Sequence, residues 1–202
     1  VWQASKKLPA ASARNIYTRT TSPAKTVLFS WDKLDSSQQA ALNKNAAGTT
    51  DSNGELRLAW VRGDQSKELN QPNGLFRTRT NLLGDIVNSS PAMVSNQDYG
   101  VGDASFVTSK ADRPPMLYVG ANDGMLHAFK EADGVEQFAY IPAETVSKLN
   151  KLTDKEYAKS HQYLVDGSPK VGDAKLGGKW KTVLLGSTGA GGKSVFTLDV
   201  TD

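Results

Sequence analysis

The tripeptide Arg62-Gly63-Asp64 is the segment whose residue types most directly suggest a binding chemistry. On an exposed loop, a guanidinium and a carboxylate separated by glycine can contact a surface receptor of the integrin type. The tripeptide also follows the apolar run LAWV, which favours a structural alternative in which Arg62 pairs with an acid such as Glu68 or Asp85. Arg62, Gly63 and Asp64 are therefore candidate receptor-binding residues, with the ion pair as the competing interpretation.

Asp51, Asn53 and Glu55 alternate as oxygen donors in a polar segment, as the ligands of calcium loops do. Calcium takes about six to eight oxygen ligands, with a bidentate acid late in an EF-hand loop. The twelfth position counted from Asp51 is Arg62, which cannot ligate a cation, so an EF-hand is excluded. Two hypotheses stay open for these residues, a calcium site of another type and a solvated turn rich in Asn, Asp and Gly.

The two histidines, His127 and His161, lie far apart in the sequence and do not by themselves indicate a metal site. His127 belongs to the apolar run MLHAFK, where strand alternation places it on the same side as Met125 and Phe129. We therefore expect a packed core histidine with satisfied ring nitrogens.

The glycine-rich stretch GSTGAGGK at 186–193 resembles a phosphate loop but misses its spacing by one residue. The residues that follow, VFTLDV, predict a strand, whereas a phosphate loop needs a helix there. We predict a hairpin without a nucleotide site. The sequence also shows no nucleophile elbow, no zinc-protease motif and no carboxylate pair with a supporting base, so it favours a protein that is not an enzyme.

The elements that must position these residues begin with a strand at 27–29 and a short helix at about 35–44, whose capping residue is Asp35. A polar loop follows at 45–54, and the run LRLAWV at 56–61 fits either a strand or a short helix. Residues 143–160 predict short helices between two β-rich parts of the chain.

A repeat organises the second half of the chain. SPAMV at 90–94 precedes MLYVGANDGMLHAFKEADGVEQFAYIP at 116–142, and SPKVGDA at 168–174 precedes WKTVLLGSTGAGGKSVFTLDVTD at 180–202. Ser-Pro thus recurs from position 90 to 168, and a strand-ending glycine recurs from 120 to 186. Asn122-Asp123-Gly124 predicts a tight hairpin with a two-residue turn, and Asp133-Gly134 predicts a second hairpin. The strands at 90–94, 116–120, 125–129 and 137–141 make one four-stranded blade.

These patterns predict a mainly β fold, a partial β-propeller of about two blades with short inserted helices, and the blades resemble those of quinoproteins (quinoprotein-like blades). Residues 1–55 form an N-terminal polar segment with a short helix that leads into the propeller, and residues 56–202 form the partial propeller with a helical insertion near 143–160. Because propellers use about four to eight blades, we expect the chain to be an excerpt of a ring.

Composition limits the classes of partner. The chain has 202 residues, a formal net charge of +3 and no cysteine, so disulfides and thiolate metal sites are excluded. The basic residues are scattered rather than clustered, which argues against nucleic acid as a partner. No apolar run approaches the ~20 residues that a membrane-spanning helix needs.

Several stretches resemble the propeller domain of the PilC/PilY family, the tip-associated adhesins and assembly factors of bacterial type IV pili. The stretches are WVRGDQSKE (60–68), FRTRTNLLGDIVNSSP (76–91), LYVGANDGMLHAFKEADGVEQFAYIP (117–142), YLVDGSPKVGDA (163–174) and WKTVLLGSTGAGGKSVFTLDVTD (180–202). The blade VGANDGMLHAF alone is also typical of quinoproteins, whereas LGDIVNSSP together with AYIP and GAGGKS is more specific.

The resemblance implies a modified propeller in the C-terminal half of an exported protein at the bacterial surface, the pilus tip or the outer membrane. It implies pilins, minor pilins or a host surface receptor as partners, with roles in the balance of pilus extension and retraction, attachment and twitching motility. In some members the domain carries a calcium-binding loop, so calcium is a candidate cofactor. Two alternatives stay open, a quinoprotein-like propeller enzyme domain and a purely structural platform that docks minor pilins.

Overall fold

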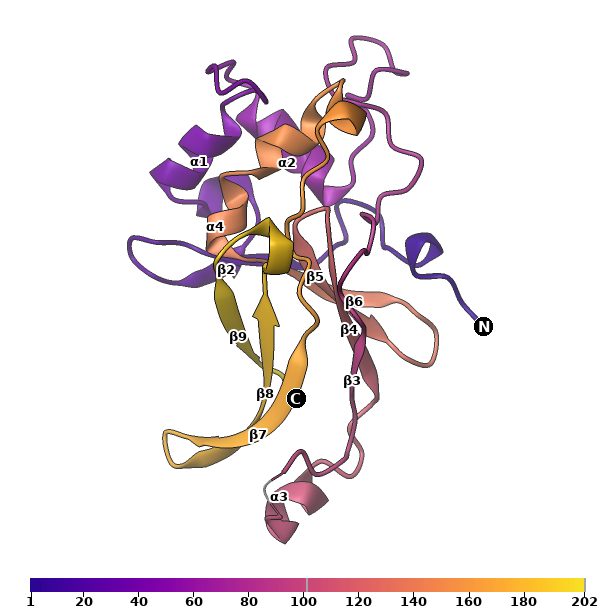
Figure 1. Cartoon of the computed structure of the whole chain (residues 1–202), viewed down its shortest axis with the longest axis vertical. Coiled ribbons are helices and arrows are strands. Elements are labelled where there is room, and N and C mark those ends of the chain that lie inside the picture. Colours follow the sequence, from indigo (N-terminus) through magenta and orange to yellow (C-terminus); the bar gives the residue numbers. More distant parts are fainter. Residues whose placement is uncertain (101, 202) are drawn as a thin grey trace.

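The computed structural model describes residues 1–100 and 102–201 and arranges their strands in two sheets (Figure 1). The six-stranded sheet has the order β2-β1-β6-β5-β4-β3, and the three-stranded sheet has the order β7-β8-β9. The strands of the larger sheet are β1 (Ile16–Arg19), β2 (Thr26–Leu28), β3 (Ala92–Val94), β4 (Met116–Ala121), β5 (Met125–Lys130) and β6 (Glu136–Ile141). Those of the smaller sheet are β7 (Lys170–Leu176), β8 (Lys179–Ser187) and β9 (Val195–Asp199).

Strands β3, β4, β5 and β6 form the predicted four-stranded antiparallel blade. The β4–β5 hairpin is confirmed, but its turn has three residues rather than two, because Ala121 pairs with Met125. Gly124 ends this turn at φ +95°, a left-handed conformation that favours glycine. The Asp123 side chain accepts a hydrogen bond from the Met125 amide (3.2 Å), which closes the turn.

The N-terminal segment extends the same sheet. Strand β1 pairs in parallel with β6, with Ile16 opposite Ala139 and Thr18 opposite Ile141. The Thr18 hydroxyl donates to the Ile141 carbonyl at 2.8 Å, and β2 then pairs antiparallel with β1. Strand β1 thus joins the N-terminal part of the chain to the sheet that contains β3, β4, β5 and β6.

The longer helices gather at one end of the sheets, and α3 lies at the opposite end (Figure 1). The α-helices are α1 (Ser36–Leu42), α2 (Gly54–Arg62), α3 (Ala104–Ser109) and α4 (Ala143–Val146). The 3-10 helices are η1 (Ala4–Lys6), η2 (Trp31–Lys33), η3 (Leu149–Thr153), η4 (Tyr157–Lys159) and η5 (Gly189–Gly191). Helix α1 confirms the predicted start, because Asp35 and Gln38 form a reciprocal capping box. Helices α4, η3 and η4 are the predicted insertion near 143–160.

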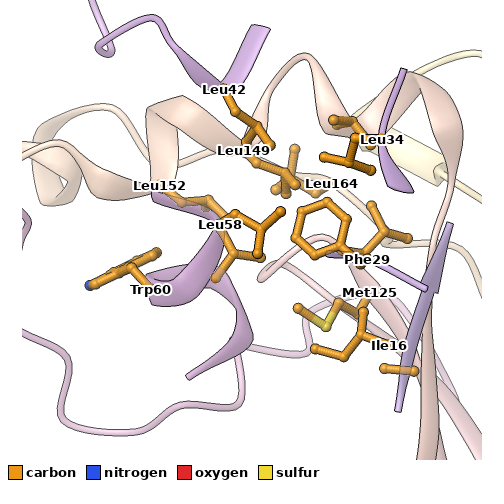
Figure 2. Packing of buried hydrophobic residues seen from close by; sticks show 14 of the residues in the cluster. Ile16, Phe29, Leu34, Leu42, Leu58, Trp60, Met125, Leu149, Leu152 and Leu164 are labelled. Atoms are coloured by element: carbon orange, nitrogen blue, oxygen red, sulfur yellow. The ribbon is translucent and has the colours of Figure 1, made fainter. Parts of the chain in front are cut away.

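One hydrophobic core lies between these helices and the neighbouring end of the larger sheet. Figure 2 shows Phe29 and Leu58 among leucines of α1, η3 and the segment before β7, with Ile16 and Met125 below them. Each fully buried side chain of this size stabilises the fold by about 1.5–3 kcal/mol. This core therefore fixes α2, and with it the tripeptide at its C-terminal end, against the blade.

A second core lies between the two sheets. It contains Tyr118 of β4, Leu126 and Ala128 of β5, and Leu184 of β8. Strand β5 is buried on both faces, because Leu126 and Ala128 face the smaller sheet while Met125 joins the core under the helices. The alternating side chains of β5 thus reach two different environments.

Candidate functional site

Arg62-Gly63-Asp64 forms the C-terminal end of helix α2. Gly63 lies at φ +117°, and its amide donates to the Trp60 carbonyl at 2.9 Å. The Asp64 amide donates to the Ala59 carbonyl at 2.9 Å, so two carbonyls at the helix end are satisfied. The glycine is therefore explained by the left-handed turn that ends the helix.

The Arg62 guanidinium holds the N-terminal segment against α2. It donates to three main-chain carbonyls, those of Phe29 (3.1 Å), Ala11 (3.0 Å) and Arg14 (2.8 Å). The predicted ion pair with Glu68 or Asp85 is wrong, because Glu68 pairs with Arg79 and Asp85 contacts His161. Their carboxylates are engaged elsewhere, and carbonyl oxygens take their place beside Arg62.

Asp64 is the less engaged charge of the tripeptide. Its Oδ1 accepts a hydrogen bond from the Ser66 amide at 2.8 Å, and the residue is half-buried. The tripeptide therefore presents a carboxylate beside a guanidinium whose donors already serve the fold. Receptor binding by these three residues stays a prediction, and Asp64 is the residue that carries it.

Arg14, Glu136, His127 and Asp123 form a buried charged network on the face of the blade that the N-terminal segment covers. Arg14 binds Glu136 through two hydrogen bonds of 2.7 and 2.8 Å. Glu136 Oε1 lies 2.7 Å from His127 Nδ1, and both Asp123 carboxylate oxygens lie 3.1 Å from His127 Nε2. Both ring nitrogens therefore face carboxylates, which is the arrangement of an imidazolium ion.

The network shifts the pKa values of His127 and Glu136. Burial alone would lower the pKa of His127, but the charges and hydrogen bonds of Asp123 and Glu136 outweigh it and raise this pKa to about 9. Burial alone would raise the pKa of Glu136, but His127 and Arg14 outweigh it and lower this pKa to about 2. The histidine is therefore a cation and the glutamate an anion at neutral pH.

Sequence reasoning found part of this network. His127 is buried, and its ring stacks on Phe129 at a centroid distance of 5.7 Å, as expected for a packed core histidine. Asp123 lies in the predicted hairpin turn, and its carboxylate also binds His127 and the Gly84 amide (2.8 Å), which the turn pattern did not indicate. Arg14 and Glu136 were missed, since 122 residues separate them and no local pattern links them.

A ladder of hydrogen bonds joins the two blades at the repeated Ser-Pro motif. The Asn88 amide and side chain donate to the two carboxylate oxygens of Asp166, at 3.1 and 2.6 Å. The Ser89 hydroxyl donates to the Gly167 carbonyl, and the Ser90 amide donates to the Ser168 hydroxyl. Each pair is separated by 78 residues, the offset of the repeat, so equivalent positions of successive blades bind one another.

Asp51, Asn53 and Glu55 lie at the start of helix α2. The Asp51 carboxylate pairs with the buried Arg57 guanidinium at 2.7 Å and accepts from the Asn53 amide at 3.1 Å. It lines an open cavity of about 330 Å³ together with one more carboxylate, that of Asp154, and two cations, Arg57 and Lys155. This donor set suits an ion-paired helix start better than the oxygen-rich shell that calcium needs. Calcium binding at these residues stays a prediction.

The residues that the structure describes are 1–100 and 102–201. Across these ranges no group of three His, Asp or Glu side chains is placed to hold a metal ion. Over the same part of the chain no helix has the length and apolar character to cross a membrane.

A four-stranded antiparallel blade, a second sheet joined to it through a repeated Ser-Pro motif, and a core between the two define a blade-repeat protein, a partial β-propeller. Residues 83–202 match the family described as the PilY1 beta-propeller domain, and the chain belongs to this family. The match includes both sheets except β1 and β2.

Curated relatives agree with this assignment. The chain is 48% identical over 187 residues to the type IV pilus biogenesis factor PilY1 of Pseudomonas aeruginosa strain PAK, covering 86% of this chain and 16% of that protein. It is 44% identical over 159 residues to a PilY1 homolog of Xylella fastidiosa strain Temecula1, covering 72% of this chain and 13% of that protein. The chain thus spans about a sixth or less of the length of these relatives.

A solved structure, the crystal structure of the Pseudomonas aeruginosa PilY1 C-terminal domain, is 50% identical to the chain. The matched region covers 49% of this chain and 18% of the chain in the crystal structure, with a TM-score of 0.38.

Proposed function

We propose that this chain is a non-enzymatic propeller segment of an exported type IV pilus adhesin and assembly factor, which binds protein or surface partners through its loops. Membership of the PilY1 beta-propeller family, over a match that includes both blades, is the observation that supports this most. The relatives are named as pilus biogenesis factors, and a bacterial surface or pilus location follows from that role.

The geometry favours binding over catalysis. The network that shifts the pKa values of His127 and Glu136 lies in the interior, and both nitrogens of His127 and both oxygens of Glu136 are engaged within the protein. Catalytic groups with shifted pKa values lie where they can reach a substrate. The buried charges here hold the N-terminal segment to the blade instead.

Pilins or minor pilins and a host surface receptor are the proposed partners, with Arg62-Gly63-Asp64 as the proposed receptor contact. Since the Arg62 guanidinium donates to three main-chain carbonyls, Asp64 supplies the less engaged charge. Calcium at Asp51, Asn53 and Glu55 is proposed as an accessory ion whose binding requires Asp51 to leave Arg57.

Affinity capture tests the partner class directly. The chain is immobilised and exposed to purified minor pilins, major pilin and an integrin ectodomain in separate assays, with Asp64→Asn as the matched variant. An assembly platform predicts capture of minor pilins that is unchanged in the variant, and a receptor adhesin predicts capture of the ectodomain that the variant loses. Capture of neither class would contradict the proposed function.

A further inference from the structure

A groove of about 460 Å³ lies along one face of helix α2. Residues 55, 58, 59 and 62 line it from the helix, at the spacing that places side chains on one helix face. Residues 11–12 and 30–32 form the opposite side. The volume is within the roughly 300–1,000 Å³ typical of ligand sites.

Several of the residues that line the groove are apolar. Ala11, Trp31, Leu58 and Ala59 line it, and Trp31 is partly buried against the main hydrophobic core. Such a surface suits a methylene chain or a flat apolar group. The indole of Trp31 also offers a ring face on which a cation can rest.

The charged side chains that line the groove are predominantly acidic. Asp32, Glu55 and Asp64 contribute three carboxylates, against the single guanidinium of Arg62. Asp32 is paired with Lys33 at 2.8 Å, so Glu55 and Asp64 are the two carboxylates that can receive a cation. Both terminal nitrogens of Arg62 already donate to main-chain carbonyls, so Arg62 has little capacity left to bind an acidic ligand. The charge balance therefore favours a cationic occupant.

We propose that this groove binds a lysine or arginine side chain carried by an extended segment of a partner protein. The aliphatic part of that side chain would lie on Trp31, Leu58 and Ala59, and its cation would lie beside Glu55 and Asp64. The inference rests on the proposed function for its biological use, because it names the chemistry of one partner. It also gives Asp64 a role that differs from presenting an exposed tripeptide.

The test uses two acetylated, amidated pentapeptides, Gly-Leu-Arg-Leu-Gly and the same peptide with citrulline in place of arginine. Citrulline keeps the shape of arginine and removes its charge. Titration of the isotope-labelled chain is followed by amide NMR shifts. We expect shifts confined to residues 30–32 and 55–64. The arginine peptide should bind about five- to tenfold more tightly than the citrulline peptide, because two exposed ion pairs contribute about that factor.

A double variant, Glu55→Gln with Asp64→Asn, is expected to reduce binding of the arginine peptide about five- to tenfold and to leave the citrulline peptide unchanged. Glu131→Gln, which removes one exposed acid outside the groove, is the control and should leave the affinities for both peptides unchanged. Raising the salt concentration should weaken binding of the arginine peptide to the unaltered chain and leave binding of the citrulline peptide unchanged. This tests the charge contribution without any substitution.

Equal affinity for the two peptides, or shifts that lie outside the groove, would overturn the inference. So would tighter binding of an otherwise identical peptide with glutamate in place of arginine. Piliation of cells that carry the double variant separates this inference from the proposed function. If the arginine peptide does not bind but the chain is still required for pili, the groove inference is overturned and the proposed function stands. If the peptide binds but the chain has no role in pili, the proposed function is overturned.

Discussion

Replacing Glu136 by Gln removes the central anion of the buried network. Arg14 then loses its bidentate partner, and the His127 cation keeps Asp123 as its counter-charge. Breaking a buried ion pair from one side costs about 3–5 kcal/mol, because the other charge stays buried without compensation. At about 2–4 °C per kcal/mol for a domain of this size, the unfolding midpoint should fall by about 6–20 °C.

The assay is urea and thermal unfolding at pH 6, with Glu131→Gln as the control. Glu131 is an exposed acid at the start of the β5–β6 turn, so its replacement should change the unfolding free energy by less than about 0.5 kcal/mol. A loss below about 1 kcal/mol in Glu136→Gln, or one equal to the control, would refute the reasoning.

The pH dependence provides a second readout of the same network. The folded-state pKa of His127 is raised to about 9, so its contribution to the unfolding free energy is full below its unfolded pKa of about 6.5 and is lost as pH rises through about 9. The folded-state pKa of Glu136 is lowered to about 2, so its contribution is full above about 4.5 and is lost as pH falls through about 2. The network therefore stabilises the fold most between about pH 4.5 and 6.5. Glu136→Gln should make the unfolding free energy depend less on pH on both the acid and the alkaline side of this range.

Three further predictions follow from the ladder, the helix end and the polar loop. Asp166→Ala removes both bonds to Asn88 and should cost about 1–3 kcal/mol, measured by urea unfolding, and an unchanged midpoint would contradict the ladder. Gly63→Ala places a side chain at φ +117° and should cost about 1–3 kcal/mol, whereas Gly172→Ala, with open space around its added Cβ, should be near neutral in the same assay. If calcium binds at Asp51, a calcium titration will raise the thermal midpoint saturably and Asp51→Asn will abolish the rise, whereas equal midpoints in calcium and chelator would remove the calcium proposal.

The strands of the blade could be predicted because their signals are local. Apolar runs bounded by Asn122-Asp123-Gly124 and Asp133-Gly134 determine which strands pair and in which direction. The Ser-Pro repeat likewise indicated two successive units, and the structure adds that its equivalent residues bind one another. The run LRLAWV left helix and strand open, since six apolar-rich residues fit either period.

The N-terminal strand and the charged network could not be predicted, because they depend on contacts between distant residues. Strand β1 has four residues and pairs with a strand more than 100 positions away, so its own pattern carries little information. The tripeptide at 62–64 shows the same limit. Its residue types suggested a receptor contact, but whether Arg62 faces solvent or carbonyl oxygens depends on where residues 11–14 and 29 fold.

The most direct test of the central claim is the number of surface pili on cells whose parent protein lacks the region that corresponds to residues 83–202, with export and abundance of the shortened protein verified. The account predicts a marked loss of surface pili, restored when the region is returned intact. Normal pilus numbers and normal surface attachment in cells that export the shortened protein would contradict a pilus role for this propeller segment.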